Sequence, residues 1–309
     1  MDDWTKDVEF ERLSPMQRLV KKALLNPLAN YLPAAWWKQW LAEGESELAL
    51  ANWRDPGGWR SMVISYQGNP EKTWDRLLVK AGTIPMALRN RKRLAARLLA
   101  RLIERAPDTP AHALCLGAGP GMIISEALKQ ADKDAHATLV DLSSDAFDFG
   151  RKHAEEMGVA DRMTFIDGDV REVAPQIKDR VDVVKTIGIF EYITDEQIRG
   201  IAEALREVMP PGSAIVFNSI SNRHGTDRFF RRVFGLNMIH RSPKEIQELL
   251  VPSGFGEFTS HPEPLGIYHV VVGRMGSGTS VTPMPASKQQ DHDPGVCGIR
   301  QDAHGTQEA

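Results

Sequence analysis

Between about residue 110 and residue 273, hydrophobic residues fall in short runs of strand length, separated by stretches with helical spacing. The runs predict strands at 112–117, 137–141, 163–167, 181–187, 213–219, 255–260 and 267–272. Strands that alternate with helices indicate a doubly wound α/β architecture with a parallel sheet. The strands are almost continuously apolar, as expected when helices cover both faces of the sheet.

The first third of the chain shows only helical patterns. Ser14 to Gln17 form a capping box that opens a short helix, and Asn26-Pro27 is expected to end it. Residues 34–42 predict a second, aromatic helix. A long helix is predicted over 88–105, with these side chains facing inward: Leu94, Leu98, Leu99, Leu102 and Ile103.

Composition divides the chain further. All seven tryptophans precede residue 75, whereas no Phe, Trp, Tyr or Leu follows residue 273. A segment without large apolar side chains cannot bury enough surface to offset its ordering entropy. The sequence therefore predicts a helical cap over 1–108, a sheet domain over 109–273 and a disordered tail over 274–309.

Charge and cysteine content narrow the function classes. The 38 basic and 41 acidic residues give a net charge of −3, which argues against bulk nucleic-acid binding. Two cysteines cannot form a disulfide framework, so a reducing cytoplasm is expected. No apolar run reaches the roughly 18–20 residues of a membrane-spanning helix, and the acidic N-terminus lacks a signal-peptide core.

The chemistry of the sheet domain is expected at the ends of its first three strands. The first strand runs into Leu-Gly-Ala-Gly-Pro-Gly over 116–121, where glycines permit a tight turn and close approach of a ligand. Asp141 ends the second strand, about 20 residues beyond Gly121, and an acid at that distance can accept hydrogen bonds from both ribose hydroxyls of a nucleotide. Asp169, or alternatively Asp167, follows the third strand and can meet an adenine amino group. Together these strand ends predict an adenosine site.

The glycine spacing also indicates what kind of nucleotide binds. Dinucleotide sites favour G-x-G-x-x-G, whereas this chain has G-x-G-x-G followed by Met122. Pro120 has no N–H to donate to a phosphate, and no Walker-type Gly-Lys-Ser/Thr follows. A ligand without phosphates fits these features better.

At this point the chain, over about 111–273, resembles the class I S-adenosylmethionine-dependent methyltransferases. The resemblance rests on the glycine loop, on Asp141 and Asp169, and on three later segments: Gly-Ile-Phe-Glu-Tyr-Ile at 188–193, Met-Pro-Pro-Gly at 209–212 and Ser-Gly-Phe at 253–255. It implies a Rossmann-like, seven-stranded sheet with an antiparallel last strand. A narrower similarity, to bacterial methyltransferases that form hydroxy-fatty-acid methyl esters, rests on IGIFEYI, VFNS, HRSPKEIQELL and LRNRKR.

The resemblance also implies roles for individual residues. S-adenosyl-L-methionine is the expected cofactor, and the residues expected to bind it are Gly117, Ala118, Gly119, Gly121, Asp141, Leu142, Gly168, Asp169, Val170 and Gly188. Arg89 or Arg91 is expected to pair with the cofactor carboxylate, and Tyr66 to reach it from the cap. Tyr192 and Glu191 are the candidate catalytic residues. Cys115 departs from the family pattern, which often has an acid there, so the contact made by that acid is in doubt.

Structural interpretations stay open beside these roles. The glycines can form a simple strand-to-helix connection, Asp141 can cap a helix, and the basic run of the long helix can be a solvated face. The segment with Trp36, Trp37 and Trp40 can pack as a cap or contact a membrane peripherally. No metal site is expected, because these histidines lack metal-ligand spacing: His112, His136, His153, His240, His261 and His269.

The sequence therefore predicts in-line methyl transfer from S-adenosylmethionine to a small, partly apolar acceptor. Two alternatives remain: an aminobutanoyl transferase similar to nicotianamine synthase, and a non-catalytic cofactor-binding protein.

Overall fold

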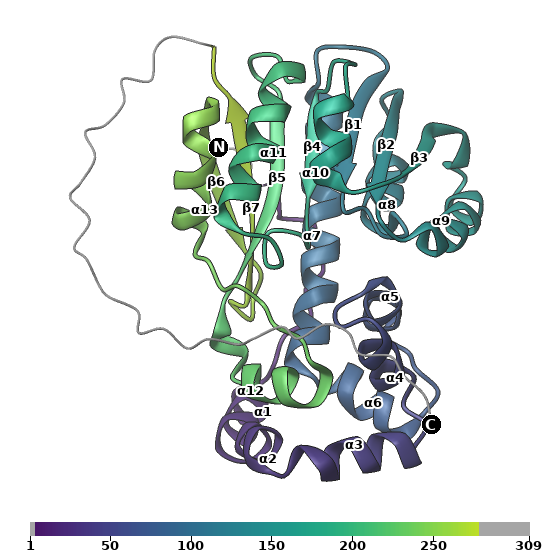
Figure 1. Cartoon of the computed structure of the whole chain (residues 1–309), viewed down its shortest axis with the longest axis vertical. Helices are drawn as coiled ribbons and strands as arrows, with labels where there is room; N and C mark the ends of the chain where they lie inside the picture. The colour runs from purple at the N-terminus through teal and green to yellow at the C-terminus, as the bar shows by residue number, and fades with distance from the viewer. Residues whose placement is uncertain (1–3, 278–309) are drawn as a thin grey trace, which may run out of the picture. The chain divides into compact units, whose positions relative to one another are not determined.

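The computed structural model describes residues 4–277. These residues form a seven-stranded sheet flanked by helices, together with a helical cap at the carboxyl edge of its first strands (Figure 1). The strands are β1 (Ala111–Leu116), β2 (Ala135–Asp141), β3 (Met163–Asp167), β4 (Val183–Thr186), β5 (Ala214–Ile220), β6 (Phe255–Pro262) and β7 (Tyr268–Met275). All seven strands expected from the hydrophobic runs are present.

The sheet order is β3-β2-β1-β4-β5-β7-β6. The first five strands pair in parallel, whereas β7 pairs antiparallel with both β5 and β6. This confirms the Rossmann-like doubly wound fold and its antiparallel last strand. Because the order reverses between β1 and β4, the carboxyl ends of these two strands border a crevice where ligands bind in such sheets.

Each face of the sheet has its own apolar core. One face packs against α7 (Thr83–Arg105), α8 (Met122–Gln130) and α9 (Ser144–Met157). The other packs against α10 (Val170–Val173), α11 (Asp195–Val208) and α13 (Pro243–Leu250). Side chains of β1 alternate between the two cores: Ala113 and Cys115 face the first, Leu114 and Leu116 the second. Burial on both faces explains why the strands are continuously apolar.

The cap contains α1 (Pro15–Val20), the π-helical segment η1 (Lys21–Leu25), α2 (Asn26–Tyr31), α3 (Ala34–Glu43), α4 (Glu47–Arg54), α5 (Trp59–Gln67) and α6 (Thr73–Lys80). The capping box of Ser14 and Gln17 is present, but the expected stop at Asn26-Pro27 is wrong. Pro27 lies in the first turn of α2, directly after the π-helical segment η1, and the helical path continues through it to Tyr31. No described helix combines the length and apolarity needed to cross a membrane.

The cap also uses a segment far along the chain. Residues between β5 and α13 form η4 (Asn222–His224), α12 (Asp227–Phe229) and η5 (Phe230–Phe234). Phe229 and Phe234 join Leu41 in the buried core of the cap, beside the tryptophans. Trp37 meets Phe229 edge to face, with ring centroids 5.3 Å apart, and Trp40 stacks on Trp74 at 6.4 Å. The sequence analysis did not assign this segment to the cap.

The boundary of the tail needs a correction. Arg274 and Met275 were expected to begin a disordered segment, but both belong to β7. Arg274 pairs with Ala214 and Met275 with Phe255, so partner strands on both sides supply their backbone hydrogen bonds. The rest of the predicted tail, from residue 278 onward, lies outside the described residues.

Candidate active site

A cavity of about 290 Å³ lies where the cap meets the carboxyl ends of β1, β2 and β4. The loop after β1 forms one wall, with Gly117, Ala118, Gly119 and Pro120. Gly119 has a φ of 53°, in the left-handed region that favours glycine, and a Cβ built there would meet only Trp59, at 3.8 Å. The backbone therefore stays open toward the cavity, as close approach of a ligand requires.

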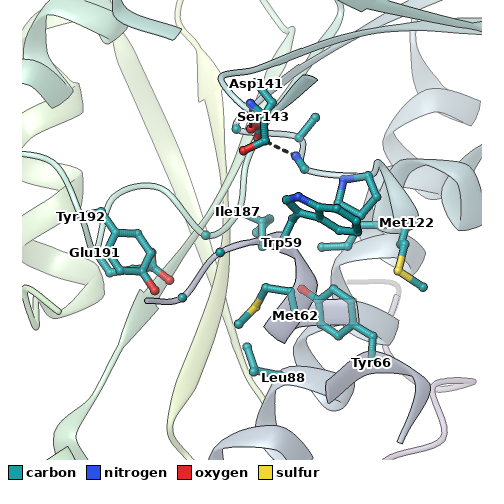
Figure 2. Close-up of a pocket in the computed structure, with 18 of the residues that line it drawn as sticks. Trp59, Met62, Tyr66, Leu88, Met122, Asp141, Ser143, Ile187, Glu191 and Tyr192 are labelled. Atoms are coloured by element: carbon teal, nitrogen blue, oxygen red, sulfur yellow. Dashed lines mark hydrogen bonds between the residues drawn. The ribbon is translucent and has the colours of Figure 1, made fainter. Parts of the chain in front are cut away.

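Asp141 ties two loops together at this edge of the sheet. One carboxylate oxygen accepts from the Gly119 N–H at 2.7 Å, and the other accepts from the Ser143 N–H at 3.0 Å. Asp141 and Ser143 both line the cavity, and Figure 2 shows them together at one end of it. Each carboxylate oxygen retains a second lone pair, so the group can hold its loops and still accept from a ligand.

The loop after β3 lies farther from the cavity. Asp169 caps α10 by accepting from the Arg171 N–H at 2.8 Å, and its carboxylate forms an ion pair with the Arg171 side chain. Gly168 donates its N–H to the Asp141 carbonyl at 3.0 Å, which fixes the loop beside the second strand. Of the residues expected to bind the cofactor, the following do not line the cavity: Gly121, Leu142, Gly168, Asp169, Val170 and Arg89.

Gly121 and Leu142 belong to the sequence motif but do not line the cavity. Gly121 has a φ of 73°, and a Cβ there would lie 2.5 Å from Leu139, so this glycine serves helix–strand packing. Leu142 is 68% exposed and points away from the cavity wall.

At the other end of the cavity, the segment after β4 supplies Gly188, Glu191 and Tyr192. Glu191 is buried and lies 3.4 Å from the Arg91 guanidinium. The amide of Asn218, on β5, donates to Glu191 at 3.4 Å and accepts from the Gly188 N–H at 2.7 Å. This buried amide, which the sequence analysis missed, therefore fixes both the loop and the acid.

Tyr192 stands at the rim of the cavity. Although the residue is 42% exposed, its hydroxyl lies against Gly57 of the cap, where a Cβ would come within 2.6 Å of it. Loss of hydration, and then the neighbouring Glu191 charge, raise the pKa of Tyr192. At neutral pH the hydroxyl is therefore a hydrogen-bond donor rather than a base.

Arg91, on α7, is a basic residue in the wall of the cavity. Its guanidinium forms an ion pair with the Glu191 carboxylate and donates to the Tyr66 hydroxyl at 3.0 Å. It also stacks over the Tyr268 ring at 4.6 Å. Its Nε atom is buried without a hydrogen-bond partner among the described residues. Both Arg91 and Tyr66 line the cavity, so an anionic group entering there would meet the positive charge of the guanidinium.

Of the two arginines expected to pair with the cofactor carboxylate, Arg91 lines the cavity and Arg89 does not. Arg89 pairs with Glu11 at 2.6 Å and donates to the carbonyls of Ser65 and Val79, each at 3.2 Å, inside the cap. Residues two apart on a helix are separated by about 200°. Because Arg91 faces the cavity, Arg89 faces away from it.

Lys185, on β4, is a cavity residue that the sequence analysis missed. Its Cα pairs in register with that of Cys115, and its ammonium donates to the Gly117 carbonyl at 3.1 Å. Burial lowers the pKa of Lys185 and raises the pKa of Cys115 to about 12, so the thiol is neutral. The place where an acid was expected thus holds a neutral thiol, with a cation beside it.

The cap closes over the glycine loop through α5. Residues 55–58 line the cavity together with Trp59 and Met62. The Trp59 indole N–H donates to Asp145 on α9 at 3.0 Å, and Arg60 pairs with the same carboxylate at 2.5 Å. These contacts join the cap to α9 beside the strand ends.

The structure brings together one group of possible metal ligands that sequence spacing did not indicate. His224, Asp227 and His240 place their ligand atoms within 4.8 Å of one another, although 12 residues separate the last two in sequence. Both histidine Nε2 atoms are buried without a hydrogen-bond partner among the described residues. Asp227 is already paired with Arg231 at 2.9 Å, so its charge is balanced within the protein. None of the three ligands lines the cavity.

Comparisons with known proteins agree with this arrangement. Residues 113–212 match the family described as methyltransferase domain. The ubiquinone biosynthesis O-methyltransferase of Actinobacillus pleuropneumoniae is 29% identical over 110 residues, which are 35% of this chain and 45% of that protein. The ubiquinone/menaquinone biosynthesis C-methyltransferase UbiE of Rhodopseudomonas palustris is 30% identical over 106 residues, which are 34% of this chain and 41% of that protein. The chain thus spans less than half the length of these curated relatives.

Solved structures share the fold over a larger part of the chain. A possible exported protein from Bordetella parapertussis superimposes with a TM-score of 0.55 at 13% identity, covering 86% of this chain and all of that one. Magnesium protoporphyrin IX methyltransferase from Synechocystis, solved with bound S-adenosylhomocysteine, gives 0.52 at 11% identity, covering 78% and 98%. Residues 113–212 thus match a methyltransferase domain, and these solved structures share the fold of the chain.

Proposed function

We propose that this chain, which contains a class I methyltransferase domain, transfers the methyl group of S-adenosylmethionine to a small, partly apolar acceptor. The observation that carries the proposal is the cavity itself, which joins the Gly119–Asp141 edge to the Glu191–Tyr192 segment beneath the cap. The bound cofactor supplies a methyl group on a sulfonium. Transfer would break the carbon–sulfur bond as the bond to the acceptor forms and leave S-adenosylhomocysteine; a carboxylate acceptor has already lost its proton, whereas a hydroxyl acceptor would lose its proton to solvent.

The residues present fit this cofactor from end to end. Asp141 has free lone pairs for ribose hydroxyls, and the open backbone at Gly119 allows close approach. Arg91, which lines the cavity, supplies a positive charge for the carboxylate of the amino-acid end, in the role that the sequence left open between Arg89 and Arg91. We keep an adenine contact from the Gly168–Val170 loop as a proposal that requires Arg171 to release Asp169.

Positioning and exclusion of water are the main contributions of the protein. The sulfonium is already activated, so holding the acceptor in line with it and removing water supply much of the rate. Tyr192 donates a hydrogen bond that orients the acceptor at the rim. Glu191, held by Arg91 and Asn218, fixes the floor of the cavity rather than taking a proton. This arrangement suits an acceptor that needs no strong base, such as a carboxylate or an acidic hydroxyl.

A product assay tests the proposal and separates the alternatives. The full chain would be incubated with S-adenosylmethionine and a panel of apolar hydroxyl and carboxyl compounds, and the nucleoside product identified by mass spectrometry. S-adenosylhomocysteine is expected, whereas methylthioadenosine would indicate aminobutanoyl transfer. Tight cofactor binding without turnover on any compound would favour a non-catalytic binding protein, and no binding of either nucleoside would refute the site.

We also propose a cytoplasmic location and a division of labour between the cap (1–108) and the sheet domain (109–273). The location is supported by the low cysteine content. The division is supported by the walls of the cavity, because the sheet supplies the cofactor edge and the cap supplies aromatic and apolar side chains. The narrower similarity to methyl-ester-forming enzymes stays a prediction.

A further inference from the structure

A second cavity, of about 200 Å³, lies inside the cap. Its walls come from α2, α4, α5, α6, the start of α7 and the segment 226–236. Met62 and Leu88 line this cavity and also the cavity described above. Two side chains without charge or hydrogen-bonding groups are therefore the common wall between the proposed reaction site and the interior of the cap.

The second cavity is chemically suited to a hydrocarbon. Aromatic and aliphatic side chains such as Trp37, Phe229 and Phe230 form most of its surface. Most polar groups in this wall are used within the protein, whereas the Trp37 indole N–H is buried without a hydrogen-bond partner among the described residues. Ser61 and Ser65 donate to carbonyls of their own helix segment, each at 2.8 Å, and Asn52 donates to the Leu48 carbonyl at 2.9 Å.

Lys21, Asn26 and Thr226 in this wall also have partners within the protein. The Lys21 ammonium donates to the Ala81 carbonyl and to the Thr83 hydroxyl, while the Asn26 amide donates to the His224 carbonyl at 3.3 Å. The Thr226 hydroxyl lies 2.9 Å from His224 Nδ1. A polar ligand would have to break such contacts, whereas an apolar chain leaves all of them intact.

This cavity also reaches the surface of the cap. Leu25, Leu28 and Leu77 line it, yet they are 41%, 41% and 50% exposed. Next to them, α1 and η1 expose Leu19 and Leu24 at 61% and 54%. An apolar chain could therefore extend from the reaction site through the cap toward an opening that is itself apolar.

We propose that the second cavity binds the hydrocarbon chain of the methyl acceptor, which makes the acceptor an amphipathic molecule with its nucleophilic group at one end. The inference rests on the proposed function and deepens it. The polar head lies near Tyr192 in the first cavity, and the chain passes Met62 and Leu88 into the second. Each methylene buried in the second cavity is then expected to tighten binding about three- to fourfold, until the chain fills the space.

The test uses the full chain saturated with S-adenosylhomocysteine, whose own binding is measured first by calorimetry. Saturated fatty acids and fatty alcohols, from hexanoic acid and hexanol to tetradecanoic acid and tetradecanol, are then titrated, and the two series show whether the head is a carboxylate or a hydroxyl. Affinity should rise with chain length and then level off. Failure of S-adenosylhomocysteine to bind would count against the proposed function, whereas its binding without any chain-length dependence would overturn the inference alone.

Matched variants show where the chain binds. Ala29→Phe places a ring in the second cavity and should abolish the gain from longer chains. Leu24→Phe adds a ring on the neighbouring exposed surface and should leave the gain unchanged. An equal loss in both variants would overturn the inference. So would a gain that persists in Ala29→Phe together with binding to phosphatidylglycerol vesicles, because the exposed apolar surface would then be the lipid site.

A second variant guards against simple misfolding. If Ala29→Phe lowers the melting temperature, Phe230→Leu provides the opposite change, because it enlarges the same cavity. The chain length at which affinity levels off should then move upward. An unchanged limit in this folded variant would overturn the inference.

Discussion

Replacing Asp141 should weaken cofactor binding far more than it weakens the fold. The carboxylate accepts from Gly119 at 2.7 Å and from Ser143 at 3.0 Å, and we propose that its free lone pairs accept from ribose hydroxyls. A charge-assisted hydrogen bond contributes about 1.5–3 kcal/mol. Losing one such bond to the ligand corresponds to about a ten- to hundredfold loss of affinity, and losing two to more.

The fold should lose less, because both protein contacts of Asp141 are made in loops at an accessible edge. A cost of about 1–2 kcal/mol corresponds to a fall in melting temperature of only a few degrees for a chain of this size. Asp141→Asn is the sharper substitution than Asp141→Ala. It keeps the shape, but its amide nitrogen cannot accept from Gly119 in the way that a carboxylate oxygen does.

Calorimetry with S-adenosylhomocysteine, together with a thermal melt of each variant, measures the two effects separately. Asp148→Ala is a suitable control, because it removes an equal charge from the exposed face of α9. It should leave both affinity and melting temperature nearly unchanged. Full affinity in a cooperatively folded Asp141→Asn variant would refute the ribose role and leave Asp141 as a structural acceptor only.

Three further predictions follow from the same network and from the cap. Glu191→Ala should lower the free energy of unfolding, measured in urea, by about 3–5 kcal/mol, because it leaves the buried Arg91 charge unpaired. An equal effect of Glu191→Gln would argue against charge as the cause. Tyr192→Phe should lower turnover about two- to tenfold and leave S-adenosylhomocysteine affinity intact, so a matching loss of affinity would contradict an acceptor-side role. Burial lowers the pKa of His224 to about 4, against about 6.5 in the unfolded chain. Between these values only the unfolded chain binds the proton, so the free energy of unfolding should fall by up to about 3 kcal/mol as the pH drops from 6.5 to 4. Urea unfolding at several pH values should show a shallower fall for His224→Phe, and parallel curves would contradict the assignment.

Local signals predicted the sheet domain well. The strands form where the hydrophobic runs predict them, and their ends carry the glycine loop and Asp141 to one edge. These features depend on residues close together in sequence, or on the rule that parallel strands end at the same edge. The family resemblance added the antiparallel last strand, which periodicity alone does not determine.

The missed features depend on contacts between distant parts of the chain. Choosing Arg91 over Arg89 requires the rotation of one helix relative to the sheet, and Glu11, which binds Arg89, lies 78 positions away. Lys185 reads as a charged interruption of an apolar strand, and only its register against Cys115 and Gly117 gives it a place in the cavity. The segment after β5 joins the cap through Phe229, packed against Trp37, a pairing that no local pattern encodes.

The continuity of α7 limits how this enzyme can be taken apart or recombined. This helix runs for 23 residues, about 35 Å, and its first turns carry Leu88 and Arg91 at the cavity while its later turns pack against α8. A chimera joined at residue 108 would take α7 from the same parent as the cap. The helix that packs against the sheet would then be foreign to that sheet. A graft that exchanges the acceptor specificity would instead have to exchange residues 10–80 and 222–241 together and keep α7 native. Under the proposed function, acceptor choice is thus a trait of two separated stretches of sequence, which must change together.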